Sequence, residues 1–109
     1  MQRYSLQKCL IVYSLMLESK IQKKVIVYLL SIGCKVINLK SATRKGNADL
    51  VMCYKGLYVE FEMKQPGKEA TKMQRIKGQE TLDAQGFWFC IHSLDEAKEA
   101  IRIIDESKD

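Results

Sequence analysis

The alternation of apolar and polar residues between Leu57 and Lys64 is the feature that most restricts the fold of this chain. Successive side chains of a β-strand point to opposite faces of a sheet, so every second residue shares a face. One face would carry Leu57, Val59, Phe61 and Met63, and the other would carry Tyr58, Glu60, Glu62 and Lys64. We therefore predict a strand on which Glu62 and Lys64 point the same way.

The segments before this strand predict a β-hairpin preceded by a helix and another strand. Asp49 to Tyr54 forms a second strand-like run, and Lys55-Gly56 provides a tight turn between the two strands. Cys34 to Leu39 predicts a further short strand. The preceding helix is indicated by apolar residues at helical spacing, with Gly33 as its end: Ile21, Val25, Tyr28, Leu29 and Ile32.

The segments after Pro66 predict a helix, a strand and a last helix. The first helix should span about residues 69–84, end at Gly86, and carry an apolar stripe of Ala70, Met73, Ile76 and Leu82. Phe87 to Ile91 predicts a buried strand. Ser93 and Glu96 form the pattern of a capping box before a helix that carries Ala97, Ala100, Ile101 and Ile104. The fold class is therefore α/β, with the order helix, three strands, helix, strand, helix.

Composition restricts the partners of this single domain. The 109 residues include 18 basic and 13 acidic side chains, which gives a net charge of +5 and favours a polyanionic partner such as nucleic acid. Cys9, Cys34, Cys53 and Cys90 show no metal-binding spacing with His92, so we expect reduced thiols and a cytoplasmic protein. The apolar run from Leu6 to Leu17 is shorter than the ~20 residues that span a bilayer, so we expect no membrane segment.

Asp49 and Glu62 are the candidate metal ligands. On adjacent strands, roughly 4.8 Å apart, their carboxylates can reach one hard cation such as Mg²⁺ or Mn²⁺. Lys64, about 6.7 Å further along the strand than Glu62, can orient an attacking water through its charge. The alternative is a surface ion pair between Glu62 and Lys64, worth at most ~1 kcal/mol.

Basic residues flank the candidate acidic site on both sides. Arg44 and Lys45 precede Asp49, while Lys68, Lys72 and Arg75 follow Lys64. These side chains can neutralise phosphates on either side of a scissile bond without reading base sequence. Lys23 and Lys24, in contrast, are assigned to a solvated helix surface.

The pattern resembles the PD-(D/E)XK, restriction-endonuclease-like superfamily, and within it the small VRR-NUC domains, the virus-type replication-repair nucleases. The similarity extends from Glu18 to about Ile104. Its matching pieces are Glu18 with Ile21-Gln22, Gly46-Asn47-Ala48-Asp49-Leu50, Val59-Glu60-Phe61-Glu62-Met63-Lys64, and Gln74 in the following helix. Ala48 replaces the proline that usually precedes the aspartate, a change that affects the rigidity of the backbone more than the chemistry.

The resemblance implies a restriction-endonuclease-like core with a mixed sheet flanked by helices, and a Mg²⁺- or Mn²⁺-dependent DNA endonuclease. It implies that the carbonyl of Met63 completes the metal ligands, that Gln74 positions the lysine or the water, and that Glu18 holds a metal-bound water or a second ion. Two alternatives remain open from the residues alone. Gln74 can be a solvated helical residue, and Glu18 can simply favour the helix N-terminus by its charge.

The resemblance also suggests a biological setting. We expect residues 18–109 to form the nuclease-like domain and residues 1–17 to be an extension, added by an upstream start codon, that packs on the domain or contacts a second subunit. A homodimer acting on branched, flapped or Holliday-junction DNA in the cytoplasm of a phage-infected bacterium is the expected form. A non-catalytic DNA-binding module with the same fold is the main alternative, and a sequence-specific restriction-type nuclease is another.

Overall fold

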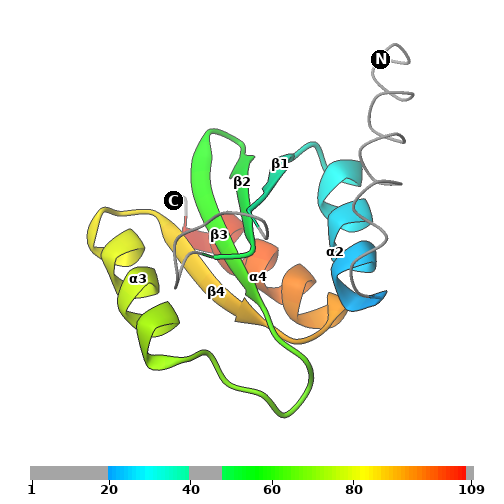
Figure 1. The fold of residues 1–109 in the computed structure, drawn as a ribbon. Helices are drawn as coiled ribbons and strands as arrows, with labels where there is room; N and C mark the ends of the chain where they lie inside the picture. Colours follow the sequence, from blue (N-terminus) through cyan, green and yellow to red (C-terminus); the bar gives the residue numbers. More distant parts are fainter. Residues whose placement is uncertain (1–19, 40–47, 108–109) are drawn as a thin grey trace.

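The computed structural model describes residues 20–39 and 48–107. Its elements, shown in Figure 1, are α2 (Lys20–Ser31), β1 (Lys35–Asn38), β2 (Leu50–Tyr54), β3 (Leu57–Met63), α3 (Lys72–Asp83), β4 (Phe87–Ile91) and α4 (Leu94–Ser107). This order confirms the predicted α/β class and the predicted sequence of helices and strands. Residues 1–17, Glu18, Arg44 and Lys45 lie outside the described residues, so the predictions made for them stay predictions.

The four strands form one mixed sheet in the order β1-β2-β3-β4. β1, β2 and β3 are antiparallel neighbours, while β4 runs parallel to β3 after the crossover through α3. The turn between β2 and β3 has positive φ angles at Lys55 (52°) and Gly56 (82°), the backbone that favours a two-residue hairpin. Leu50 pairs with Phe61 in this hairpin, which makes Asp49 and Glu62 the next residues along the two strands.

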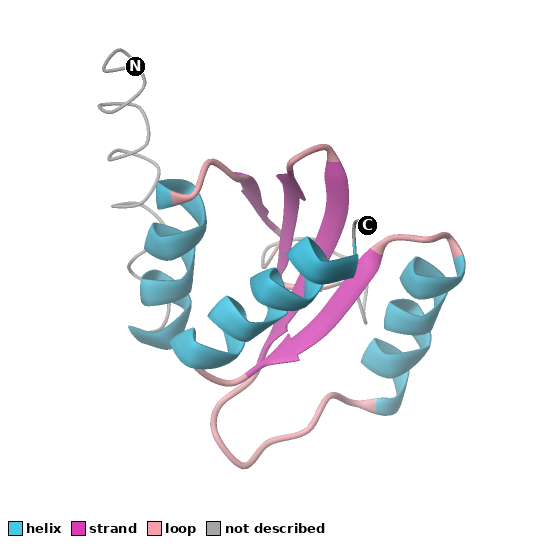
Figure 2. Ribbon diagram, turned by 180° about the vertical axis from the view of Figure 1, so that it is seen from behind, coloured by secondary structure: helices cyan, strands magenta, loops and turns pink. Residues whose placement is uncertain are grey.

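α2 and α4 lie side by side on one face of the sheet, as Figure 2 shows from behind. The apolar face of β3 packs there, and Val59 and Phe61 are completely buried. The partners from the two helices are their apolar stripes, namely Val25, Ile26, Leu29, Leu30, Ala97, Ala100, Ile101 and Ile104. The alternation along β3 and the helical spacing in the sequence thus identified the two sides of the main core.

α3 packs against β4 and β3 through its polar residues and one glycine. Of the predicted apolar stripe only Ala70 is buried, and it lies before the helix, which begins at Lys72. Met73 is 48% exposed, Ile76 is 45% exposed and Leu82 is 43% exposed. Gly78 is instead the buried residue of this helix, and a Cβ atom placed on it would lie 2.4 Å from Cδ2 of Trp88. The helix approaches the sheet so closely that only a residue without a side chain fits at the contact.

Three local predictions need correction. Gln85, with φ of 71°, adopts the left-handed conformation after α3, whereas Gly86 does not. β4 is only partly buried along residues 87–90, because it is the last strand of the sheet, and Ile91 alone is fully buried in it. Ser93 Oγ accepts a hydrogen bond from the Glu96 N–H, but the Glu96 carboxylate accepts from the His92 N–H, so only half of the predicted capping box forms.

Gly33, with φ of 92°, ends α2 as predicted. The thiols of Cys34, Cys53 and Cys90 are free. Within residues 20–39 and 48–107, no helix has both the length and the apolar character needed to cross a membrane.

Candidate metal centre

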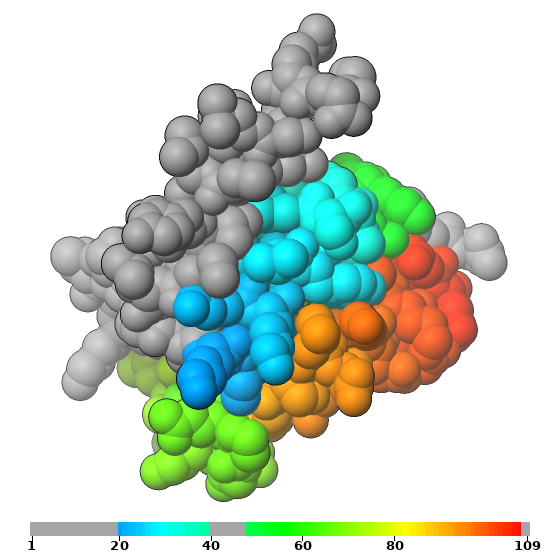
Figure 3. Space-filling model, turned by 90° about the vertical axis from the view of Figure 1, so that its right-hand side faces the viewer, coloured from blue at the N-terminus to red at the C-terminus, as the bar shows by residue number. Residues whose placement is uncertain are grey.

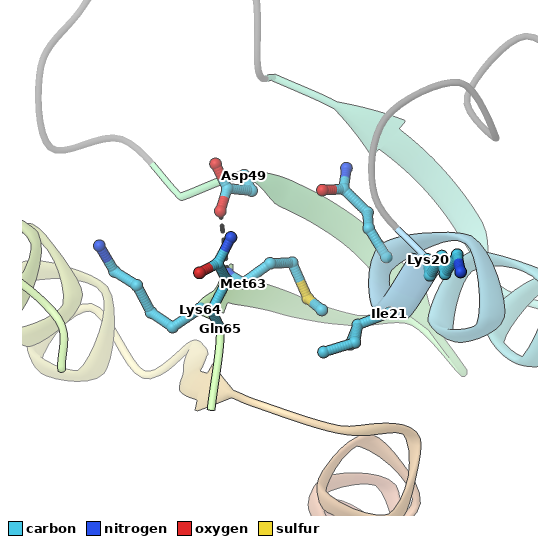
Figure 4. A pocket seen from close by; sticks show the side chains of 7 residues that line it. Lys20, Ile21, Asp49, Met63, Lys64 and Gln65 are labelled. Carbon is cyan, nitrogen blue, oxygen red and sulfur yellow. Dashed lines mark hydrogen bonds between the residues drawn. The ribbon is translucent and has the colours of Figure 1, made fainter. Parts of the chain in front are cut away.

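Asp49 is held at the junction of β2 and β3 by a backbone hydrogen bond. Its Oδ2 atom accepts from the N–H of Met63 over 2.9 Å, the contact marked in Figure 4. The antiparallel register explains this contact. Leu50 pairs with Phe61, so Asp49, one residue before Leu50, lies beside the end of β3, where Met63 is the last residue. The bond directs the carboxylate of Asp49 towards the end of β3, next to Glu62.

Glu62 is a buried acid, because α3 covers the polar face of β3 at this point. Only 2% of the residue is exposed. Its Oε2 atom accepts a hydrogen bond of 2.8 Å from Nε2 of Gln74, whereas the buried Oε1 atom has no hydrogen-bond partner among the described residues. Burial and then the neighbouring Asp49 carboxylate raise the pKa of Glu62 to about 8, while the charge of Lys64 opposes this rise.

An unpartnered buried carboxylate oxygen beside a second carboxylate is the arrangement that a hard divalent cation stabilises. Burying a charged oxygen without a partner is unfavourable, and a cation between two carboxylates removes both the desolvation penalty and their mutual repulsion. Asp49 and Glu62 therefore fit a Mg²⁺ or Mn²⁺ ion. No group of three or more acidic, histidine or cysteine side chains gathers among residues 20–39 and 48–107.

Gln74 is oriented by the start of α3. Its Oε1 atom accepts from the N–H of Thr71 over 2.8 Å, and its own N–H donates to Oγ1 of Thr71 over 3.1 Å. This capping box fixes the amide so that Nε2 is left to donate to Glu62. The alternative of a solvated Gln74 does not describe this structure, in which its amide contacts the candidate metal ligand.

A second contact ties α3 to the same face of β3. The carboxylate of Glu60 accepts hydrogen bonds from Thr81 Oγ1 over 2.7 Å and from Tyr58 Oη over 2.5 Å. Burial and the Glu60 carboxylate raise the pKa of Tyr58 to about 12. Glu60 and Glu62 thus hold the two halves of α3 against the sheet, and Glu60 takes no part in the candidate centre itself.

The carboxylate of Asp49 faces a cavity of about 410 Å³, shown in Figure 4. Its lining comes from α2, from the start of β2 and from the end of β3, and consists of Lys20, Ile21, Gln22, Asp49, Met63, Lys64 and Gln65. Lys20 and Lys64 bring positive charge to the cavity that holds Asp49.

Gln22 lines this cavity, although the sequence pattern indicated no role of its own for this residue. It is only 4% exposed and reaches the cavity from the first turns of α2. Its spacing of three and four residues from the buried Val25 and Ile26 places it on the inner side of the helix. A polar side chain at such a position is the signal that would have identified it.

The structure brings five of the predicted site residues to one place: Asp49, Glu62, Met63, Lys64 and Gln74. Lys68 lies on the exposed loop after β3, and Lys72 is exposed in the first turn of α3. The Arg75 guanidinium donates a hydrogen bond of 2.5 Å to the carbonyl of Ala70, in the loop between β3 and α3. Part of its hydrogen-bonding capacity is therefore already used within the protein. Their predicted contacts with phosphate stay predictions.

Known structures identify this architecture. A solved structure described as a VRR_NUC domain superposes on this chain with a TM-score of 0.68 and 19% sequence identity, covering 76% of this chain and 91% of the other. The chain has the VRR-NUC fold. No protein-family model and no curated protein sequence matches the chain. The VRR-NUC fold is therefore shown by the arrangement of helices and strands.

Proposed function

We propose that this protein is a metal-dependent DNA endonuclease that uses Mg²⁺ or Mn²⁺ to hydrolyse phosphodiester bonds. The observation that supports this most directly is the paired position of Asp49 and Glu62, with the Glu62 Oε1 atom buried and without a hydrogen-bond partner among the described residues. An ionised oxygen in such a position is unfavourable unless a proton or a cation binds it. The VRR-NUC fold and the excess of basic residues agree with a DNA substrate.

In this proposal Asp49, Glu62 and the carbonyl of Met63 hold the metal ion. The ion would polarise the phosphodiester and stabilise charge on the leaving oxygen. Lys64, which lines the same cavity as Asp49, would hold the attacking water and the phosphate by its positive charge. Gln74 would keep the Glu62 carboxylate in one orientation, and the Met63 N–H does the same for Asp49.

A non-catalytic DNA-binding module is the rival function. Such a protein would place two carboxylates next to a polyanion without any benefit, because like charges repel across a cavity. Retention of both acids together with Lys64 thus favours the enzyme. A sequence-specific restriction-type nuclease is a weaker rival, because the described residues form the VRR-NUC domain without an added recognition segment.

Branched DNA such as flaps or Holliday junctions is the proposed substrate, in the cytoplasm of a phage-infected bacterium. One active site per chain cuts one strand, so a twofold homodimer would place two sites on the two antiparallel strands. Light scattering would test this assembly. A monomer at micromolar concentration that cleaves both strands would rule the dimer out.

A panel of labelled linear, flapped and four-way DNAs, incubated with Mg²⁺, Mn²⁺ or EDTA, tests the proposed activity. We expect cleavage with either metal, none with EDTA, and none for Asp49→Asn or Lys64→Ala. Asp49→Asn keeps an oxygen that can accept from the Met63 N–H, so its loss of activity would report the charge and not misfolding. Lys55→Ala, which removes a lysine at the exposed hairpin turn, is the matched control. DNA binding without cleavage under all conditions would favour the binding module.

A further inference from the structure

We propose that a groove between α2 and α4 binds the sugar-phosphate backbone of the DNA arm that leaves the candidate metal centre. This inference rests on the proposed function, and it adds a second contact surface for the same substrate. The groove has a volume of about 460 Å³ and lies where the first turns of α2 and α4 meet. Figure 3 shows this side of the molecule, with the blue start of α2 next to the orange start of α4.

Four lysines surround an apolar floor in this groove. They are Lys20, Lys23, Lys24 and Lys98, and the floor is made by Val27, Tyr28 and Leu94. None of these seven lining residues is acidic. None of the four lysines forms an ion pair with another described residue, in contrast to Lys55 and Lys77.

The groove adjoins the candidate metal centre through Lys20. This residue lines both the groove and the cavity that contains Asp49 and Lys64. A chain of positive charge therefore leads from the site of the proposed cleavage onto the face formed by α2 and α4. A ligand whose scissile phosphate lies at Asp49 would meet this groove as it leaves the cavity.

The fold gives Lys23 and Lys24 a context that the sequence does not show. Taken alone, the two residues belong to a solvated helix surface. In the folded chain Lys98 from α4 joins them, and its Nζ atom lies 5.6 Å from the centre of the Tyr28 ring. Such a cation–π contact holds the Lys98 ammonium over the groove. Charges from two helices thus converge on one surface.

The spacing of the lysines suits a nucleic-acid backbone. Lys20 and Lys24 are separated by four residues, or about 6 Å along the helix axis. Neighbouring phosphates of one DNA strand lie at a similar separation, so these lysines can meet adjacent phosphates. Lysine offers a single positive point charge, whereas the planar guanidinium of arginine can form paired hydrogen bonds with a base or a carboxylate. The lysines of this groove therefore suit contacts with the DNA backbone. The apolar floor can pack against deoxyribose between the phosphates.

Direct binding in EDTA tests this groove separately from the activity. The affinity of a fluorescent flapped DNA is measured by anisotropy at several salt concentrations, for the wild-type protein and for Lys23→Gln/Lys24→Gln/Lys98→Gln. We expect the triple variant to bind at least about tenfold more weakly and to lower the slope of log affinity against log salt by about 2 to 3, because each phosphate contact contributes about 0.9. Circular dichroism and thermal unfolding verify that the variant is folded.

The control is Lys35→Gln/Lys55→Gln/Lys77→Gln, which removes the same charge from exposed or partly exposed lysines outside the groove. An equal loss of affinity in this control would show a general charge effect and overturn the proposal, as would an unchanged affinity in the groove variant. Lack of DNA binding by the wild type, or a groove variant that loses affinity only for an acidic peptide such as polyglutamate, would overturn it as well. Absence of cleavage with Mg²⁺, by contrast, would contradict the proposed enzyme and leave the binding result intact.

Discussion

Gln74 on α3 donates a hydrogen bond of 2.8 Å from its Nε2 atom to Oε2 of the buried Glu62 on β3. The same amide closes the capping box with Thr71, so the start of the helix and the orientation of the candidate metal ligand depend on one side chain. The crossover helix between two parallel strands therefore contributes to the candidate centre. Its packing determines how Glu62 is presented.

Replacing Gln74 by alanine should destabilise both the fold and the centre. The change removes a hydrogen bond to a buried carboxylate and half of a capping box, so the free energy of unfolding should fall by about 1–3 kcal/mol. Cleavage should require more Mg²⁺, because Glu62 loses its fixed orientation. Chemical denaturation and a Mg²⁺ titration of cleavage measure the two effects.

Gln79→Ala is the matched control for this change. Gln79 lies on the same helix and donates to Asp83 Oδ1, but this contact is exposed. We expect a change in unfolding free energy within about 0.5 kcal/mol and an unchanged Mg²⁺ requirement. Equal effects of the two substitutions would show that Gln74 acts only as a helix residue.

Replacing Glu62 by glutamine should separate metal binding from folding. The amide keeps the size of the side chain, cannot ionise, and can donate to Asp49 where the Oε1 atom now lacks a partner. The variant should unfold at a temperature no lower than that of the wild type in EDTA. Mg²⁺ should raise the unfolding temperature of the wild type and leave that of the variant unchanged.

Glu80→Gln removes the same charge from an exposed position of α3 and serves as the control. Its response to Mg²⁺ should equal that of the wild type. If Mg²⁺ stabilised Glu62→Gln as much as the wild type, Glu62 would not be a metal ligand.

Replacing Gly78 by alanine should destabilise the protein, although alanine favours a helix by about 1 kcal/mol over glycine. The new methyl group would lie within 2.8 Å of three atoms of the Trp88 ring, so the ring or the helix must move. Forcing extra volume into such a contact costs typically 1–3 kcal/mol, and we expect about this loss in unfolding free energy.

The double variant Gly78→Ala/Trp88→Leu isolates the contact. In the Trp88→Leu background the alanine should be neutral or stabilising, because the large ring is no longer in its way. Urea unfolding of the four proteins of this cycle measures the coupling. A purely additive cycle would contradict close packing between Gly78 and Trp88.

His92 should make stability depend on pH. Its Nδ1 atom lies 2.9 Å from Glu96 Oε1 and its Nε2 atom lies 2.7 Å from the carbonyl of Lys68. Both neighbours accept hydrogen bonds, so only the doubly protonated imidazolium satisfies both contacts. The Glu96 side chain, followed by the Lys68 carbonyl, raises the pKa of His92, and His92 lowers the pKa of Glu96.

The contribution of this pair should be largest at mildly acidic pH. A raised histidine pKa stabilises the fold fully below the unfolded value of about 6.5, and the effect is lost as pH rises through the folded value. A lowered glutamate pKa stabilises the fold above about 4.5 and loses its effect as pH falls. The difference in unfolding free energy between the wild type and His92→Ala, measured from about pH 5 to about pH 8, should therefore decrease. A constant difference would show that His92 binds the Lys68 loop without a charge.

Much of the fold followed from patterns between residues close in sequence. The alternation in β3 separated Val59 and Phe61 from Glu60 and Glu62, Lys55-Gly56 indicated the hairpin turn, and Gly33 marked the end of α2. Asp49, Glu62 and Lys64 could be assigned to one site for the same reason, since a hairpin brings the ends of its two strands together. These features depend on backbone geometry and side-chain period, which operate over a few residues.

Tertiary packing alone decided which of these faces is covered. Glu62 is on the polar face of its strand, yet α3 buries it, and Met73 is in an apolar spacing, yet it is exposed. The Gln74 contact and the meeting of Lys98 with Lys23 also depend on elements that are distant in the sequence. Periodicity specifies which residues share a side of a helix or strand, whereas the burial of that side depends on which element packs against it. For α3, the buried side was decided by the close approach to Trp88 that Gly78 allows.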